Sequence, residues 1–208
     1  SYPEVIMKDI YRIEMSNYQF QIYEILRRKE RLSEKGKEKN KKNKKNKKKK
    51  VVKSTFRVFS RQASNFVFPE DILRPYPDPK FIVSIKKNNN KEKNDNKNFE
   101  RSLMEEEKLN DEGKLSLNYK RRINEALNKL DDKGDLYLRP GPNGLDKLSP
   151  KMKMILENME KCNGLIFIYS NFRSLEGIEI LSKVLDFNGY SRYGTRSNNP
   201  KYAIYSGN

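Results

Sequence analysis

The sequence predicts an α/β protein, in which the start of a parallel-sheet lobe follows a mainly helical region with disordered Lys/Asn-rich insertions. Three observations predict this fold class. Residues 149–208 read as helix, strand, helix, strand, which is the order of a parallel sheet with a right-handed crossover. Residues 16–34 and 54–145 carry helical apolar stripes and capping signals. Residues 35–50 and 86–98 are dominated by Lys and Asn and have too little apolar surface to offset the entropy lost on ordering.

The same observations divide the chain into four parts. Residues 1–34 are expected to form an extended segment and a helix, and residues 35–53 a Lys-rich insertion. Residues 54–145 are expected to form a helical region with a polar insertion at 86–98. Residues 146–208 are expected to form the first half of the sheet lobe.

The first helix and strand of the lobe have clear signals. Ser149 is a good N-cap, and Pro150 suits the first helical position, where its missing N–H is not needed. The apolar face of this helix consists of Met152, Ile155, Leu156 and Met159. Residues 165–169 (LIFIY) are a continuous apolar run, typical of a strand buried on both faces.

A second helix and strand follow. Ser174 is expected to cap this helix, and Gly189 to end it. Its apolar stripe consists of Leu175, Ile178, Leu181, Val184 and Leu185. Residues 202–205 (YAIY) are the second strand, and the two strands are expected to be parallel neighbours.

Helical patterns also occur before the lobe. Ser16 and Gln19 form an S-x-x-Q capping box at the start of one helix. Residues 54–68 place Phe56, Phe59, Ala63 and Phe66 on an approximate helical stripe that we expect to join the core. Residues 118–130 form a third helix, with Ile123, Leu127 and Leu130 on one side.

The charge favours a polyanionic partner such as nucleic acid. The formal net charge is +17, from 45 Lys and Arg against 28 Asp and Glu, and residues 35–50 alone hold eleven Lys and one Glu. This density of like charge predicts an extended or only partly helical tract. A/T-rich coding is an alternative explanation of the Lys and Asn runs, and a solvated insertion is an alternative to a phosphate-binding tract.

Several classes of site are excluded by the residues present. The chain has no His and one Cys, which excludes a His/Cys zinc site, a His general base and an internal disulfide, and fits a reducing, intracellular compartment. No apolar run is long enough to span a membrane. The acidic patch at residues 105–107 has no apolar surroundings that would raise a carboxylate pKa. We therefore predict no catalytic and no metal-binding residue in this chain.

Residues 149–190 (SPKMKMILENMEKCNGLIFIYSNFRSLEGIEILSKVLDFNGY) resemble the start of the second RecA-like lobe of Swi/Snf-type superfamily 2 helicases. The resemblance is to the branch of large DNA viruses, the poxvirus nucleoside triphosphatase I-like enzymes. In that family this region carries the fourth helicase motif and a later Ser-Gly turn, which here would be IYSNFRSLEG and IYSGN. IYRIEMSNYQFQIYEILRRKE also fits the family's pattern just after the first lobe. The resemblance implies that residues 1–34 and 54–145 lie between the lobes.

The resemblance implies an ATP-dependent DNA helicase or translocase, with a role in transcription as one setting. Such enzymes hold ATP and Mg²⁺ between two lobes, with a Walker A loop and an Asp-Glu pair in the first lobe and arginine fingers late in the second. None of these motifs occurs here. We therefore expect a piece of a longer enzyme that binds no cofactor by itself and is inactive alone. Its location would be the virion or the viral factory in the host cytoplasm, with the nucleus as an alternative.

The candidate nucleic-acid contacts lie at turns and on the helix within residues 54–68. Ser170 and Asn171 follow the predicted strand at its carboxyl end, where α/β sheets place ligands, and the next helix N-terminus can bind a phosphate. The alternative is that these side chains only cap and turn the chain. The full set is Ser170, Asn171, Arg173, Ser174, Ser206, Gly207, Arg57 and Arg61.

The expected partners are DNA, or alternatively RNA, through its phosphate backbone, and the first RecA-like lobe of a parent chain, with no membrane. Two further functions stay open. One is a non-enzymatic basic nucleic-acid-binding protein or degenerate helicase remnant. The other is a protein-interaction scaffold whose charge serves only solubility.

Overall fold

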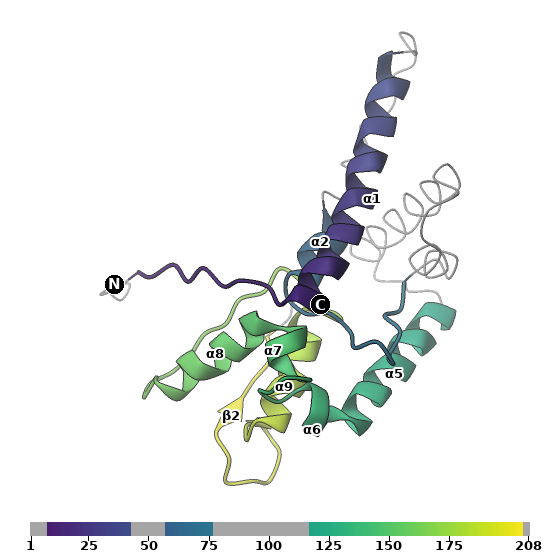
Figure 1. Ribbon diagram of the computed structural model, residues 1–208. Helices are drawn as coiled ribbons and strands as arrows, with labels where there is room; N and C mark the ends of the chain where they lie inside the picture. The colour runs from purple at the N-terminus through teal and green to yellow at the C-terminus, as the bar shows by residue number, and fades with distance from the viewer. Residues whose placement is uncertain (1–7, 43–56, 77–116, 206–208) are drawn as a thin grey trace.

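The computed structural model describes residues 8–42, 57–76 and 117–205 (Figure 1). In these ranges the chain is mainly helical, with two short strands. The elements are α1 (Asn17–Lys42), α2 (Val58–Ala63), α5 (Leu117–Asp132), α6 (Gly134–Tyr137), α7 (Leu145–Leu148), α8 (Pro150–Glu160), α9 (Ile178–Phe187), β1 (Ser191–Arg192) and β2 (Lys201–Tyr202). The predictions for residues 43–53, 86–98 and 105–107, and for Ser206 and Gly207, lie outside the described residues.

Helix α1 begins at the predicted cap and runs further than predicted. The backbone N–H of Gln19 donates to Ser16 Oγ over 3.0 Å, which is half of the capping box. The Gln19 side chain does not complete the box, because its Nε2 donates to the carbonyl oxygen of Ala63 at 2.8 Å. The helix continues to Lys42, so the described part of the Lys-rich tract, residues 35–42, is helical. The carboxyl half of α1 projects away from the body (Figure 1).

The core joins α1, α2, the segment after α2, and α5 to α9. The predicted stripe at residues 54–68 is confirmed for its described members, because Phe59, Ala63 and Phe66 are buried. Within the described residues 57–76, residues 58–63 are helical, and the chain then turns and runs irregularly to Tyr76. The side chains that are completely buried include Phe59, Phe66, Leu26, Leu130, Leu138, Leu145, Leu148, Leu175 and Ile180.

The helix predicted over residues 118–130 is confirmed as α5, with Ile123, Leu127 and Leu130 buried. A short loop follows, and α6 then packs against α9. A Cβ atom at Gly134 would lie 2.1 Å from the ring of Phe187, so only glycine permits this contact. The short helices α6 and α7 were not predicted, since each is a single turn without a periodic pattern.

The predicted start of α8 is confirmed. Ser149 Oγ accepts a hydrogen bond from the backbone N–H of Met152 at 3.1 Å, and Pro150 occupies the first helical position. Ser149 also donates to the carbonyl oxygen of Asn65, which ties the cap to the segment after α2. Met152 and Leu156 are buried, and the other two members of the predicted face are half-buried.

The buried strand predicted at residues 165–169 is wrong for the described part of the chain. These residues are extended without regular secondary structure, with Leu165 fully exposed, Phe167 89% exposed and Tyr169 76% exposed. The described sheet instead pairs β1 with β2 in parallel, Ser191 opposite Lys201. A strand needs a neighbour for its N–H and C=O groups, and the described residues supply none to this run. The RecA-like lobe therefore stays a prediction.

The second helix of the predicted lobe is present as α9, and it holds the small sheet. Gly189 ends it as predicted, with φ at +86°, and the N–H of Tyr190 donates to the carbonyl of Leu185 at 3.1 Å. The Tyr202 hydroxyl donates to Asp186 at 2.9 Å and links β2 to α9. Burial, followed by this hydrogen bond, raises the pKa of Tyr202 to about 12. Among the described helices, none is both long and apolar enough to cross a lipid bilayer.

Candidate nucleic-acid interface

The loop of residues 170–177 connects the exposed apolar run to α9. Its first turn is stabilised by its own side chains: Ser170 Oγ donates to the carbonyl of Phe172 at 3.1 Å and accepts from the N–H of Phe172 at 3.2 Å. The Tyr169 hydroxyl donates to Asn171 Oδ1 at 2.9 Å. Ser170 therefore has the turn-forming role that was the alternative to ligand binding, whereas Asn171 is exposed.

The second half of the loop is held in an unusual conformation. Leu175 has φ of +47°, in the left-handed region that favours glycine, although its side chain is completely buried. Its N–H donates to Glu179 Oε2 at 2.9 Å. At Gly177 a Cβ atom would lie 1.9 Å from the carbonyl oxygen of Phe172, so the backbone approaches itself more closely than any other residue permits. A strained, packed loop of this kind is often found at functional sites.

The N-terminus of α9 differs from the prediction. Gly177, not Ser174, is the N-cap, and no side chain caps the helix. The N–H of Gly177 donates to the carbonyl of Ser174, and those of Ile178 and Glu179 donate to carbonyls of Phe172 and Arg173, at 3.0–3.2 Å. Because these donors are already used, the helix N-terminus does not offer them to a phosphate. The predicted capping role of Ser174 is wrong, and its side chain is exposed.

Helix α2 brings one of the predicted arginines, Arg61, next to this loop. Arg61 lies on the exposed side of α2, with its guanidinium 5.2 Å from the ring centroid of Phe172. Arg57 is exposed one turn earlier and has φ of +59° at the N-cap. Arg173 is exposed on the adjoining loop.

Arg74 joins α2, the irregular segment after it and the loop. Its guanidinium makes a forked ion pair with Glu176, in which Nε binds Oε1 and Nη2 binds Oε2, the latter at 3.1 Å. Nη2 also donates to Gln62 Oε1 at 2.8 Å. Burial alone would lower the pKa of Arg74, but the carboxylate of Glu176 raises it above its usual value, which keeps the guanidinium charged.

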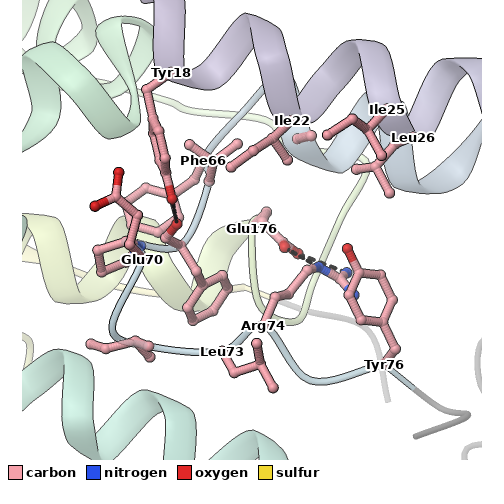
Figure 2. A pocket seen from close by; sticks show the side chains of 15 residues that line it. Tyr18, Ile22, Ile25, Leu26, Phe66, Glu70, Leu73, Arg74, Tyr76 and Glu176 are labelled. Atoms are coloured by element: carbon pink, nitrogen blue, oxygen red, sulfur yellow. Dashed lines mark hydrogen bonds and ion pairs between the residues drawn. The ribbon is translucent and has the colours of Figure 1, made fainter. Parts of the chain in front are cut away.

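A cavity of about 170 Å³ lies beside this ion pair (Figure 2). Its wall is largely apolar and comes from the first turns of α1 and the segment after α2. Arg74, Tyr76 and Glu176 lie at one end, and Tyr18 and Glu70 at the other (Figure 2). The Tyr18 hydroxyl donates to the carbonyl of Phe68 at 2.8 Å, and burial, followed by the charge of Glu70, raises the pKa of Tyr18 to about 12.

Outside this site, several exposed charges form ion pairs. Lys133 binds Asp71 at 2.6 Å, and Arg121 on α5 lies 3.7 Å from Glu125. The hydrogen bond from Lys133, and then that from Tyr137, lowers the pKa of Asp71. Exposed pairs of this kind contribute little to stability, so their residues are suitable positions for control substitutions.

The described residues contain no group of three or more His, Cys, Asp and Glu side chains placed to hold a metal ion. ATP and Mg²⁺ therefore stay expectations for a parent enzyme. Of the predicted contacts, the structure brings Arg61 next to the loop that carries Asn171 and Arg173, and Arg57 lies exposed at the N-cap of α2.

Arg74, Glu176 and Phe172 were not predicted to be part of this site. Arg74 and Glu176 are 102 positions apart, so no local pattern could have linked them. The one available signal was the position of Phe172, Glu176 and Gly177 within the IYSNFRSLEG stretch, which had already been singled out as a motif.

Comparison with known proteins gives one partial match. The chain is 38% identical over 60 residues to a protein of Acanthamoeba polyphaga mimivirus named "Putative ATP-dependent RNA helicase R563". The match covers 28% of this chain and 10% of that protein. It supports a helicase-like relationship to a large-DNA-virus protein in coarse terms. No family model matches the chain, and no solved structure matches it.

Proposed function

We propose that this chain is part of a viral-type ATP-dependent helicase or translocase, and that α2 and the loop of residues 170–177 contact a nucleic-acid backbone. The observation that carries the proposal is the contact between two stretches that are far apart in the sequence. Each had been expected, separately, to face nucleic acid, and Arg61 of one lies over Phe172 of the other. The similarity to a helicase-named viral protein supports the same reading.

The proposed contacts are electrostatic and independent of base sequence. Arg57, Arg61 and Arg173 supply guanidinium groups that match phosphate geometry, and the exposed amide of Asn171 supplies a neutral hydrogen-bonding group. The amides at the start of α9 are not part of the proposal, because they donate to loop carbonyls. Binding should therefore weaken as the salt concentration rises, since each neutralised phosphate releases a counterion.

The test is the affinity of the purified chain for short fluorescent oligonucleotides, measured against salt concentration. We expect Arg61→Ala to weaken binding by about fivefold, the effect of one modest charged contact. Arg121→Ala is the matched control, because it removes the same charge from an exposed position on α5. Equal losses from the two substitutions would mean that only net charge matters and would contradict the proposed interface.

The same binding assay tests which nucleic acid the chain prefers, and a separate measurement of ATP hydrolysis tests whether the chain is active alone. Single-stranded DNA, duplex DNA and RNA probes should be compared, because the family resemblance points to DNA and the relative's name to RNA. We expect no ATP hydrolysis by the chain alone, and hydrolysis would contradict the proposal that it is one part of the enzyme. The surrounding gene should encode a Walker A loop upstream and an arginine-rich motif downstream. Their absence would favour a non-enzymatic binding protein.

A further inference from the structure

Arg74 contacts three separate parts of the chain. It pairs with Glu176 of the loop through two nitrogens, and it donates to Gln62 of α2 and to the carbonyl of its neighbour Pro75 at 2.9 Å. Its guanidinium also lies over the ring of Tyr76 (Figure 2), 4.3 Å from the ring centroid, and 5.1 Å from the ring centroid of Phe59. The side chains of Arg74 and Glu176 are 11% and 1% exposed.

The buried ion pair between Arg74 and Glu176 is not expected to contribute much to the free energy of unfolding. Removing two charges from water offsets much of their attraction, and apolar side chains of similar volume often replace such pairs without loss. A forked pair has a defined direction, however, and it fixes the relative position of the two segments that it joins. The main effect of this ion pair is therefore to fix the position of the loop relative to the segment that carries Arg74.

Glu176 lies at the most constrained point of the loop. The residue before it, Leu175, has φ of +47°, and the residue after it, Gly177, approaches the carbonyl of Phe172 too closely for any side chain. Such a conformation persists only where surrounding contacts hold it. The described contacts that hold it from outside the loop and α9 include those of Arg74.

We propose that Arg74 is a positioning residue, which through Glu176 holds the loop of residues 170–177 against α2, so that Asn171 and Arg173 share one backbone-binding surface with Arg61. This inference rests on the proposed function, because it assumes that this surface binds nucleic acid. Arg74 itself is nearly buried and would not touch the ligand.

A double-mutant cycle between Glu176 and Arg173 tests the inference with the same oligonucleotides. Arg173→Ala should weaken binding by about fivefold in the wild-type chain, the effect of one charged contact. In a Glu176→Gln background, where the loop is no longer held, the same substitution should change affinity by less than about twofold. If Arg173→Ala weakened binding by the same factor in both backgrounds, the inference would be overturned and the proposed function would stand. An absence of binding by the wild-type chain would overturn both.

A matched cycle uses Lys133→Met in place of Glu176→Gln. Lys133 belongs to an exposed ion pair with Asp71, so we expect Arg173→Ala to have its full effect in that background. Arg74→Lys is a second way to loosen the loop, because lysine keeps the charge but cannot form the fork. It should reduce the effect of Arg173→Ala as Glu176→Gln does.

Amide hydrogen exchange separates loop positioning from general loss of stability. In both loosened variants the N–H groups of Gly177 and Ile178, which donate within the loop, should exchange faster. The N–H of Lys153 in α8, which donates to the carbonyl of Ser149, should keep its wild-type protection. Uniformly faster exchange, or loss of the cooperative unfolding transition in both variants, would show a role in folding only and would overturn the inference.

Discussion

Helix α8 and the segment that follows it were predicted with equal clarity but turned out differently. Helix α8 starts at Ser149 and buries its apolar face, as its sequence pattern indicates. Residues 165–169, five positions after that helix, form no strand and expose Leu165, Phe167 and Tyr169. The difference lies in where each element finds its hydrogen-bond partners.

A helix satisfies most of its backbone groups within itself, so caps and periodicity define it locally. A strand finds these partners in another strand, and parallel neighbours are separated by a long stretch of chain. Within the described residues, β1 and β2 pair over two residues each, and the apolar run is not part of that sheet. A continuous apolar run therefore indicates a tendency to be buried, whereas burial itself depends on chain outside the run.

The helical core should be the most sensitive part of the molecule to truncation. Leu130 of α5 is completely buried, and Leu130→Ala should lower the free energy of unfolding by about 3 kcal/mol, since it loses transfer energy and leaves a cavity. Leu136→Ala is the control, because Leu136 on α6 is 49% exposed. Denaturant unfolding measures both. Similar effects of the two substitutions would contradict the core as described.

The loop before α9 should be nearly as sensitive, although it lies next to the exposed run. Gly177→Ala places a Cβ atom against the carbonyl of Phe172, and such overpacking should cost about 2 kcal/mol. At Gly164, by contrast, a Cβ atom would meet nothing within 4 Å, so Gly164→Ala should have little effect. Thermal unfolding of the two variants compares them directly. Equal midpoints would show that the loop relaxes and is not held as the structure indicates.

The candidate site shows the same division between local and distant information. Ser170 and Asn171 could be proposed as candidate contacts from the sequence because they follow a predicted strand at a turn, and Arg57 and Arg61 because they are basic residues on a predicted helix. The contacts that organise these residues were not predictable, since the partner of Glu176 lies 102 positions away. The start of α9 was predicted wrongly because a local signal was misleading. Ser174 looks like an N-cap, but the left-handed turn at Leu175 moves the start of the helix to Ile178.

Alkaline pH should destabilise the helical core through ionisation of Tyr18. Burial raises the pKa of Tyr18 from 10.0 to about 12, so the folded state favours the neutral phenol. The neutral phenol of Tyr18 therefore stabilises the folded state fully below pH 10, and this stabilisation is lost as the pH rises toward 12. One pKa unit corresponds to about 1.4 kcal/mol, so the total is roughly 2 kcal/mol after allowing for the partial exposure of the side chain. Tyr18→Phe should make the unfolding free energy less dependent on pH in this range. An unchanged pH dependence would place the phenol in water.

Tyr202 gives the matching measurement in the C-terminal segment. Its pKa is also raised to about 12, by burial and then by the hydrogen bond to Asp186, but its ring is only partly buried. Tyr202→Phe should therefore change the pH dependence in the same direction as Tyr18→Phe, and by less. A larger effect from Tyr202 would mean that β2 is packed more firmly than the helical core.

The smallest effect should come from the apolar run itself. The sequence predicts that a charge placed in residues 165–169 costs several kcal/mol, because a strand covered on both faces offers no partner to a carboxylate. The structure predicts the opposite for Phe167, whose side chain is 89% exposed: Phe167→Asp should change the free energy of unfolding by less than about 0.5 kcal/mol. Chemical denaturation of this variant measures the effect, with Leu130→Ala as the reference for a buried position. A loss of several kcal/mol would show that the run is covered in solution, which would restore the buried strand and remove the contrast between the two regions. A small loss would show that Phe167 is exposed in solution, as it is in the structure.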